Sequence, residues 1–168
     1  LGGSFGSSVT GTANILMGAV LAQGRSVIEN AACEPEVQDL ADFLAKMGAR
    51  IQGIGTHRLV VDGVEALGGA TPRVIPDRIE AGTFLAAAAI TNGDLKVRGA
   101  IAEHQDAGID RLTDIGAELT VEDGSIRARA SKGLRSTQVA TLPYPGFPTD
   151  MQAQLLTLLT IADGISVV

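Results

Sequence analysis

The chain has 168 residues, the size of one ordinary domain or of two small ones. Hydrophobic residues make up 45% of the chain, and 19 acidic against 13 basic residues give a formal net charge of −6. This composition excludes an intrinsically disordered chain, which combines low hydrophobicity with high net charge. It also argues against a nucleic-acid binder, which needs clustered Lys and Arg.

Few side chains are available for metal or disulfide chemistry. Cys33 is the single cysteine, so an internal disulfide is excluded. Together with His57 and His104 it shows no metal-ligand spacing, and we expect neither a metal nor a cofactor. No run approaches the ~18 apolar residues of a membrane span, so we expect a cytoplasmic protein without membrane contact. The chain starts at Leu1 without an initiator Met, which suggests a piece of a longer protein.

Three apolar stretches recur along the chain at intervals of about 70 residues. The first two predict helices over residues 12–22 and 83–91, and the third helix is expected to start near Thr149 or Asp150. Both earlier helices are apolar on nearly every side, which predicts that they are buried between other elements. Each stretch breaks at a glycine and resumes as a strand rich in Val or Ile; these glycines are Gly24, Gly93 and Gly164.

A second module repeats at the same interval. Apolar residues at i, i+3, i+4 and i+7 predict a helix over residues 40–47, and residues 112–119 repeat its pattern. Gly48 and Gly116 follow these helices, where a left-handed C-terminal position favours glycine. A pair of short strands is expected after each glycine, over residues 50–53 with 58–62 and residues 118–121 with 125–130.

Helix, strand, helix, strand, strand is therefore the expected unit, about 70 residues long. This predicts an α+β fold of repeated βαβαββ-type units, with buried helices packed against mixed sheets. The chain would hold roughly two and a third such units, and the proline-containing segment 69–76 is the expected domain boundary. The alternative is a complete small α/β domain whose internal similarity is accidental.

Polar segments precede the first two apolar helices. Gly6, Ser7, Ser8 and Val9 stand at the first helix start, where free N–H groups and hydroxyls suit a phosphate or diphosphate. Plain N-capping by Ser is the alternative. The second helix start carries two acidic residues and one basic residue, Asp77, Glu80 and Arg78. Arg78 is suited to an anionic substrate, and a salt-bridged turn is the alternative.

The third segment, residues 143–150, carries three prolines and ends in Asp150 at the expected helix start. Asp150 is interpreted either as an N-cap or as a general base held by a rigid backbone. Cys33 stands next to Glu34, whose charge raises the pKa of a thiol, so we expect a poor nucleophile there.

Several strings carry a family likeness: GSSVTGTANILMGAVLAQG (residues 6–24), VIENAACEPEV (27–37), PDRIEAGTF (76–84) and FPTDMQAQ (147–154). Over its whole length the chain resembles the UDP-N-acetylglucosamine enolpyruvyl transferases. The resemblance implies an α/β prism fold and a longer enzyme of two domains, each made of three repeats, with the substrates in the cleft between them. Residues 1–72 would be the last repeat of the first domain, and residues 73–168 one repeat and the start of another in the second.

The resemblance also implies a reaction. The enolpyruvyl group of phosphoenolpyruvate would pass to the 3-hydroxyl of UDP-N-acetylglucosamine, a committed step of peptidoglycan synthesis and hence of cell shape and division. Asp150 would take the sugar hydroxyl proton, and Gly6, Ser7, Ser8 and Val9 would contact the UDP side. The family's reactive cysteine, the target of fosfomycin, has no counterpart in this chain, so the chain would need the rest of the enzyme for turnover. The alternatives are a shikimate-pathway enolpyruvyl transferase and a non-catalytic binding or scaffold module.

Overall fold

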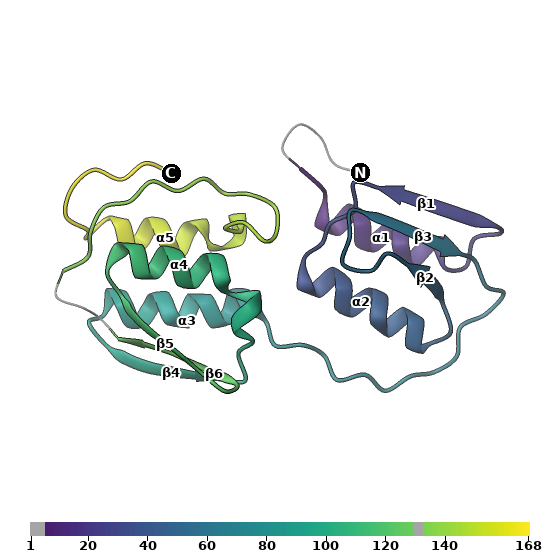
Figure 1. Ribbon diagram of the computed structural model, residues 1–168, viewed down its shortest axis with the longest axis horizontal. Helices are drawn as coiled ribbons and strands as arrows, with labels where there is room; N and C mark the ends of the chain where they lie inside the picture. Colours follow the sequence, from purple (N-terminus) through teal and green to yellow (C-terminus); the bar gives the residue numbers. More distant parts are fainter. Residues whose placement is uncertain (1–5, 130–132) are drawn as a thin grey trace. The chain divides into compact units, whose positions relative to one another are not determined.

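The structure is a computed structural model that describes residues 6–129 and 133–168. Within it, residues 1–75 and residues 76–168 form two compact units (Figure 1), each described here by itself. The expected strand end at residue 130 lies outside the described residues. In the described ranges, no helix has both the length and the apolar character needed to cross a bilayer.

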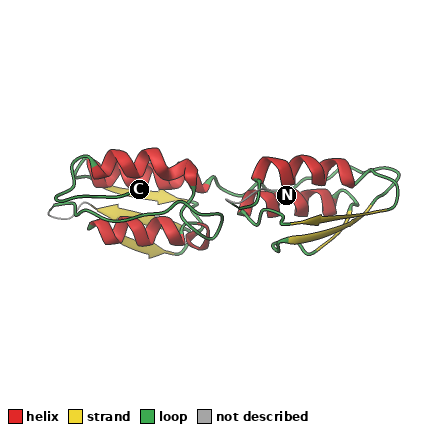
Figure 2. Ribbon diagram, turned by 90° about the horizontal axis from the view of Figure 1, so that it is seen from above, coloured by secondary structure: helices red, strands yellow, loops and turns green. Residues whose placement is uncertain are grey.

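The first unit consists of two helices and a three-stranded sheet. Its elements are α1 (Val9–Ala19), β1 (Arg25–Glu29), α2 (Pro35–Lys46), β2 (Arg50–Gln52) and β3 (Arg58–Asp62). The strands lie in the order β1-β3-β2, and β3 pairs with both neighbours in antiparallel register. In Figure 2 its helices form one layer and its strands another. Leu16, Leu44, Leu59 and Val61 belong to the core between these layers.

The second unit repeats this arrangement and adds a further helix. Its elements are α3 (Arg78–Ile90), β4 (Asp94–Arg98), the 3₁₀ helix η1 (Ala102–His104), α4 (Asp106–Ile115), β5 (Glu118–Glu122), β6 (Ser125–Arg129), the 3₁₀ helix η2 (Thr149–Met151) and α5 (Gln152–Leu159). The strand order is β4-β6-β5, again antiparallel. α3 packs against β4 and β6 and also against α5. Leu85, Ile126, Leu155 and Leu158 lie in the core that these elements share.

The two units therefore have one topology, as the spacing of the sequence modules predicts. The glycines at the ends of the second helices explain part of this agreement, because Gly48 has φ +107° and Gly116 has φ +109°. A side chain is strained in that region, so glycine ends each helix at the same point and sends the chain into the next strand. The predicted α+β class is confirmed.

One detail of the prediction is wrong: the sheets are antiparallel, not mixed. The last strand of each unit lies in the centre of its sheet, and both neighbours run opposite to it. The two outer strands of a sheet are parallel to each other, but they are not hydrogen-bonded neighbours. In the described residues, no named strand precedes α1 or α3 either.

The expected strand after Gly164 does not form. Residues 160–168 make only two isolated parallel bridges, Arg135 with Asp163 and Gln138 with Val167. β1 and β4 each pair over five residues with a regular strand, whereas this segment meets only the irregular segment 135–138. The third helix also starts later than expected, because residues 149–151 form a 3₁₀ turn and α5 begins at Gln152.

Burial of the first helix is one-sided, against the prediction from its apolar sequence. Leu16 is fully buried, whereas Ile15 and Met17 are 45% and 44% exposed. α1 packs on α2, β1 and β3, so only one face is covered within this unit. α3 is closer to the prediction: it packs against β4, β6, α4 and α5, and its exposed residues are Glu80, Phe84 and Ala87.

Candidate functional site

In the first unit, the predicted contact residues stand at the start of α1. Ser8 is the N-cap of this helix, and its Oγ accepts a hydrogen bond from Gly11 N at 3.1 Å. Gly6 and Ser7 precede it and are half-buried, and Val9 is the first helical residue. Ser8 thus has the capping role that was the alternative to substrate binding. Its side chain remains exposed, so capping does not exclude a ligand there.

The side-chain hydroxyl of Thr12 connects this helix start to a neighbouring loop by hydrogen bonds. Thr12 is fully buried, and its Oγ1 donates to the carbonyl of Ser8 at 2.7 Å. The same hydroxyl accepts from Ala32 N at 2.9 Å. One buried hydroxyl therefore joins the Ser8 turn to the loop between β1 and α2.

In the second unit, the charged residues at the start of α3 have separate roles. Asp77 is the N-cap, and its Oδ1 accepts from Ile79 N at 2.7 Å and from Glu80 N at 3.1 Å. Arg78 is half-buried, with its guanidinium 5.8 Å from the centre of the Tyr144 ring. Glu80 is exposed. Asp77 thus caps a helix, and the interaction that Arg78 makes with Tyr144 was not foreseen.

Asp150 lies in the 3₁₀ turn before α5, and its side chain is exposed. It makes no capping hydrogen bond, and neither does Thr149. The turn is closed by backbone, with Met151 N donating to Pro148 O at 3.1 Å. Of the two interpretations of Asp150, the N-cap is therefore wrong, and the carboxylate is left open to solvent.

Two of the predicted segments meet within this unit. A cavity of about 20 Å³, room for about one water, lies between the start of α3, the turn before α4 and the proline-rich segment. Arg78, His104, Tyr144 and Pro148 are among the residues that line it, and Asp150 is next to this lining in sequence without being part of it. Tyr144 Oη also donates to the carbonyl of Glu103 at 3.3 Å.

Sequence reasoning missed Tyr144 and the turn at residues 102–105. Tyr144 is the one Tyr in the chain, and it stands between two prolines of the segment 143–150. Its position in this segment could have marked it as a candidate residue. The turn at 102–105 carries no motif, so its place beside Arg78 emerges only from the fold.

Cys33 is 9% exposed, and its Sγ lies 3.3 Å from His57 Nδ1. Burial raises the pKa of the Cys33 thiol, and the nearby charge of Glu34 raises it further. His57 Nδ1 also lies 3.0 Å from the carbonyl of Ala31, which can only accept, so this nitrogen carries the proton. The imidazole is therefore not set up to take a proton from the thiol at this atom. In the parts of the chain that the structure describes, no three His, Cys, Asp or Glu side chains gather as metal ligands.

Comparisons of this chain with known proteins give matches that agree with one another. The family model of EPSP synthase (3-phosphoshikimate 1-carboxyvinyltransferase) matches residues 4–168. A UDP-N-acetylglucosamine 1-carboxyvinyltransferase of Geotalea daltonii is 52% identical over 162 residues, which is 96% of this chain and 39% of the relative. A UDP-N-acetylglucosamine 1-carboxyvinyltransferase 1 of Caldanaerobacter subterraneus subsp. tengcongensis is 52% identical over 161 residues, with the same shares of the two chains. The chain thus spans about two fifths of the length of these relatives.

The fold also has a counterpart among solved structures. The crystal structure of the enolpyruvyl transferase NikO from Streptomyces tendae matches with a TM-score of 0.83 at 24% identity, over 95% of this chain and 39% of that one. This likeness agrees with the enolpyruvyl-transferase fold expected from the sequence motifs. The chain therefore belongs to the EPSP synthase (3-phosphoshikimate 1-carboxyvinyltransferase) family.

Proposed function

We propose that this chain is part of a UDP-N-acetylglucosamine 1-carboxyvinyltransferase. Relatives at 52% identity carry that name, and the family model is that of a carboxyvinyltransferase. The enzyme would act in the bacterial cytoplasm, in peptidoglycan synthesis and so in cell shape and division. Its substrates would be UDP-N-acetylglucosamine and phosphoenolpyruvate, with no resident cofactor.

The reaction consists of an addition followed by an elimination. The sugar 3-oxygen bonds to C2 of phosphoenolpyruvate while C3 gains a proton, and the hydroxyl proton leaves to a base. The resulting tetrahedral ketal then loses inorganic phosphate and a proton from C3, which restores the double bond. The protein must supply a base near the hydroxyl and cationic or N–H groups near the phosphates.

Asp150 is assigned as the base, and one observation carries this assignment. Its carboxylate is exposed, caps no helix, and has no hydrogen-bond or ion-pair partner within residues 6–129 and 133–168. Pro145 and Pro148 restrict the backbone that leads to it, so little conformational freedom is lost when it meets a substrate. A base held in this way typically contributes ~10²–10⁴-fold in rate.

The start of α1 is assigned to the UDP side of the sugar nucleotide. Ser7, Ser8 and Val9 stand where free backbone N–H groups and the partial positive charge of the helix meet, an arrangement suited to a diphosphate. Asp77, Arg78 and Glu80 are proposed to lie near the substrates, with Arg78 as the only cation among them.

An acceptor comparison tests this function. The full-length enzyme would be given phosphoenolpyruvate with either UDP-N-acetylglucosamine or 3-phosphoshikimate, and phosphate release would be measured. Release with the sugar nucleotide alone is the expected result. Release with 3-phosphoshikimate alone would support the shikimate-pathway alternative, and release with neither would support a non-catalytic module.

A further inference from the structure

Met151 directly follows Asp150 in the chain. Its side chain packs against α3 at Gly82, where the helix has no side chain. Met151 is 3% exposed. A Cβ placed on Gly82 would lie 2.8 Å from Met151 Cε and 2.9 Å from Met151 Sδ. Real Cβ atoms do not approach other atoms so closely, so the thioether occupies the space that a side chain at position 82 would fill.

The same space is closed on another side by Gln105. This buried side chain donates from Nε2 to the carbonyl of Arg78 in the first turn of α3. Its Oε1 would lie 3.3 Å from a Cβ at position 82. A methyl group there would therefore press on Met151 and on a hydrogen-bonded glutamine at once, and the end of the Met side chain is the part that can give way.

Helix propensity does not account for glycine at this position. Gly82 lies in the second turn of a 13-residue helix that is otherwise rich in alanine. Alanine is the better helix former, because glycine loses more backbone entropy when it becomes helical. What the glycine provides is the close approach of Met151.

We propose that Gly82 and Met151 are positioning residues that fix where the Asp150 carboxylate stands. This inference rests on the proposed function, in which Asp150 is the base. Asp150 makes no hydrogen bonds of its own that would hold it, so its place is set through the backbone on either side. Pro148 restricts the backbone before Asp150, and the buried side chain of Met151 fixes the backbone after it. A misplacement of about 1 Å in a reacting group can cost about a hundredfold in rate.

The test is Gly82→Ala in the full-length enzyme. We expect kcat to fall at least about tenfold, with the KM for UDP-N-acetylglucosamine nearly unchanged, because the residues at the start of α1 are untouched. The matched control is Gly18→Ala in α1, where an added Cβ meets nothing within 4 Å. This control should keep wild-type kcat and melt slightly higher, as expected for alanine in a helix.

A second variant separates positioning from general damage to the fold. Gly82→Ala combined with Met151→Val keeps the total number of side-chain heavy atoms, since one is added and one is removed, and it takes away the Sδ and Cε atoms that the new Cβ would meet. We expect this pair to recover kcat at least about threefold over Gly82→Ala, a coupling typical of residues in contact. The inference is overturned if Gly82→Ala turns over like the wild type and melts higher, or if the pair is no better than Gly82→Ala. A wild-type enzyme without turnover would instead overturn the proposed function itself.

Discussion

Thr12 and Thr83 stand 71 positions apart and make the same hydrogen bond. Each donates its Oγ1 to the carbonyl four residues earlier at 2.7 Å, Thr12 to Ser8 and Thr83 to Ile79. The second bond differs, because Thr12 accepts from Ala32 N at 2.9 Å and Thr83 accepts from Gln154 Nε2 at 2.8 Å. The repeat thus preserves one contact at each helix start and uses the other for a different neighbour.

This difference predicts unequal effects of the same substitution. Thr12 is fully buried, so Thr12→Val would leave the Ala32 N–H without an acceptor, at a cost of about 1–3 kcal/mol. Thr83→Val should cost less, at most about 1 kcal/mol, because the bond from Gln154 is only partly buried and its donor is a side chain that can turn away, whereas the Ala32 N–H is buried and fixed in the backbone. Urea unfolding of the two variants measures both costs. An equal or larger loss for Thr83→Val would contradict the prediction.

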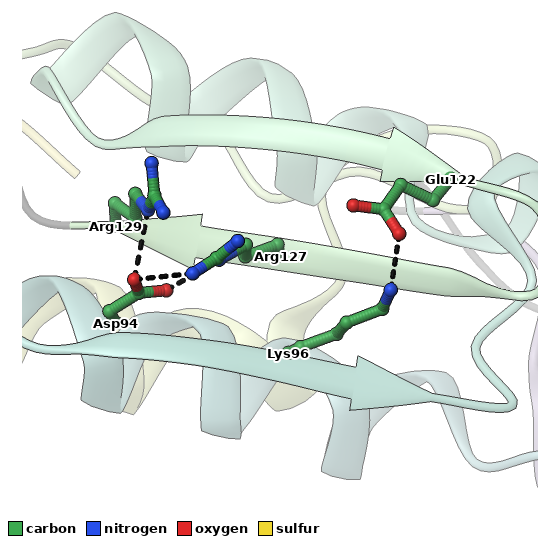
Figure 3. A network of polar contacts seen from close by, with 5 residues as sticks. All are labelled: Asp94, Lys96, Glu122, Arg127 and Arg129. Atoms are coloured by element: carbon green, nitrogen blue, oxygen red, sulfur yellow. Dashed lines mark hydrogen bonds and ion pairs between the residues drawn. The ribbon is translucent and has the colours of Figure 1, made fainter.

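The outer face of the second sheet carries an ion-pair network (Figure 3). Asp94 accepts from Arg127 Nε at 2.6 Å and from Arg129 Nε at 2.9 Å, and Lys96 reaches across to Glu122. The hydrogen bond from Arg127 is the main cause that lowers the pKa of Asp94 from 3.8 to about 2.

This lowered pKa predicts a pH-dependent contribution to stability. A carboxyl group whose pKa is lower in the folded state stabilises the fold above its unfolded pKa, and this contribution is lost as the pH falls through the folded pKa. Asp94→Asn should therefore melt below the wild type at neutral pH, and the gap should close between about pH 4 and about pH 2. Asp110→Asn, on the exposed face of α4, is the control and should show no such gap. A gap for Asp94→Asn that stays constant down to about pH 2 would refute the assignment.

Cys33 is predicted to be a slow nucleophile and to be dispensable for turnover. Its thiol is buried, and burial together with Glu34 raises its pKa, so little thiolate is present at neutral pH. Iodoacetamide should modify Cys33 much more slowly in the folded chain than in urea, and fosfomycin should not modify it. Rapid alkylation of the folded chain, or loss of turnover in a folded Cys33→Ala enzyme, would be the opposite result.

The repeat and the ends of its second helices could be predicted from the sequence, because they depend on local patterns. Glycines that follow the second, amphipathic helix of each unit, Gly48 and Gly116, favour a left-handed helix end wherever the fold places them. The strand after Gly164 was mispredicted because a strand needs a partner, and the partner is not encoded next to it.

The candidate site could be predicted only in part, for a related reason. Asp150 and Ser8 were found because they stand beside prolines or at helix starts, which are local signals. The contacts of Arg78 with Tyr144 and of Gly82 with Met151 join neighbouring repeats, 66 and 69 residues apart, and a repeat in the sequence does not say which side chains of two units meet. Whether Asp150 caps its helix could not be decided from position alone, because a 3₁₀ turn at residues 149–151 moves the start of α5 past it.

The central claim is that Asp150 is the base of a carboxyvinyl transfer, and turnover of Asp150→Asn in the full-length enzyme tests it most directly. Since Asp150 caps no helix, Asp150→Asn and Asp150→Ala should both melt within a degree or so of the wild type. Phosphate release from phosphoenolpyruvate and UDP-N-acetylglucosamine should fall at least about a hundredfold in Asp150→Asn, while Asp110→Asn keeps the wild-type rate. Normal turnover of Asp150→Asn under the same conditions would contradict the account.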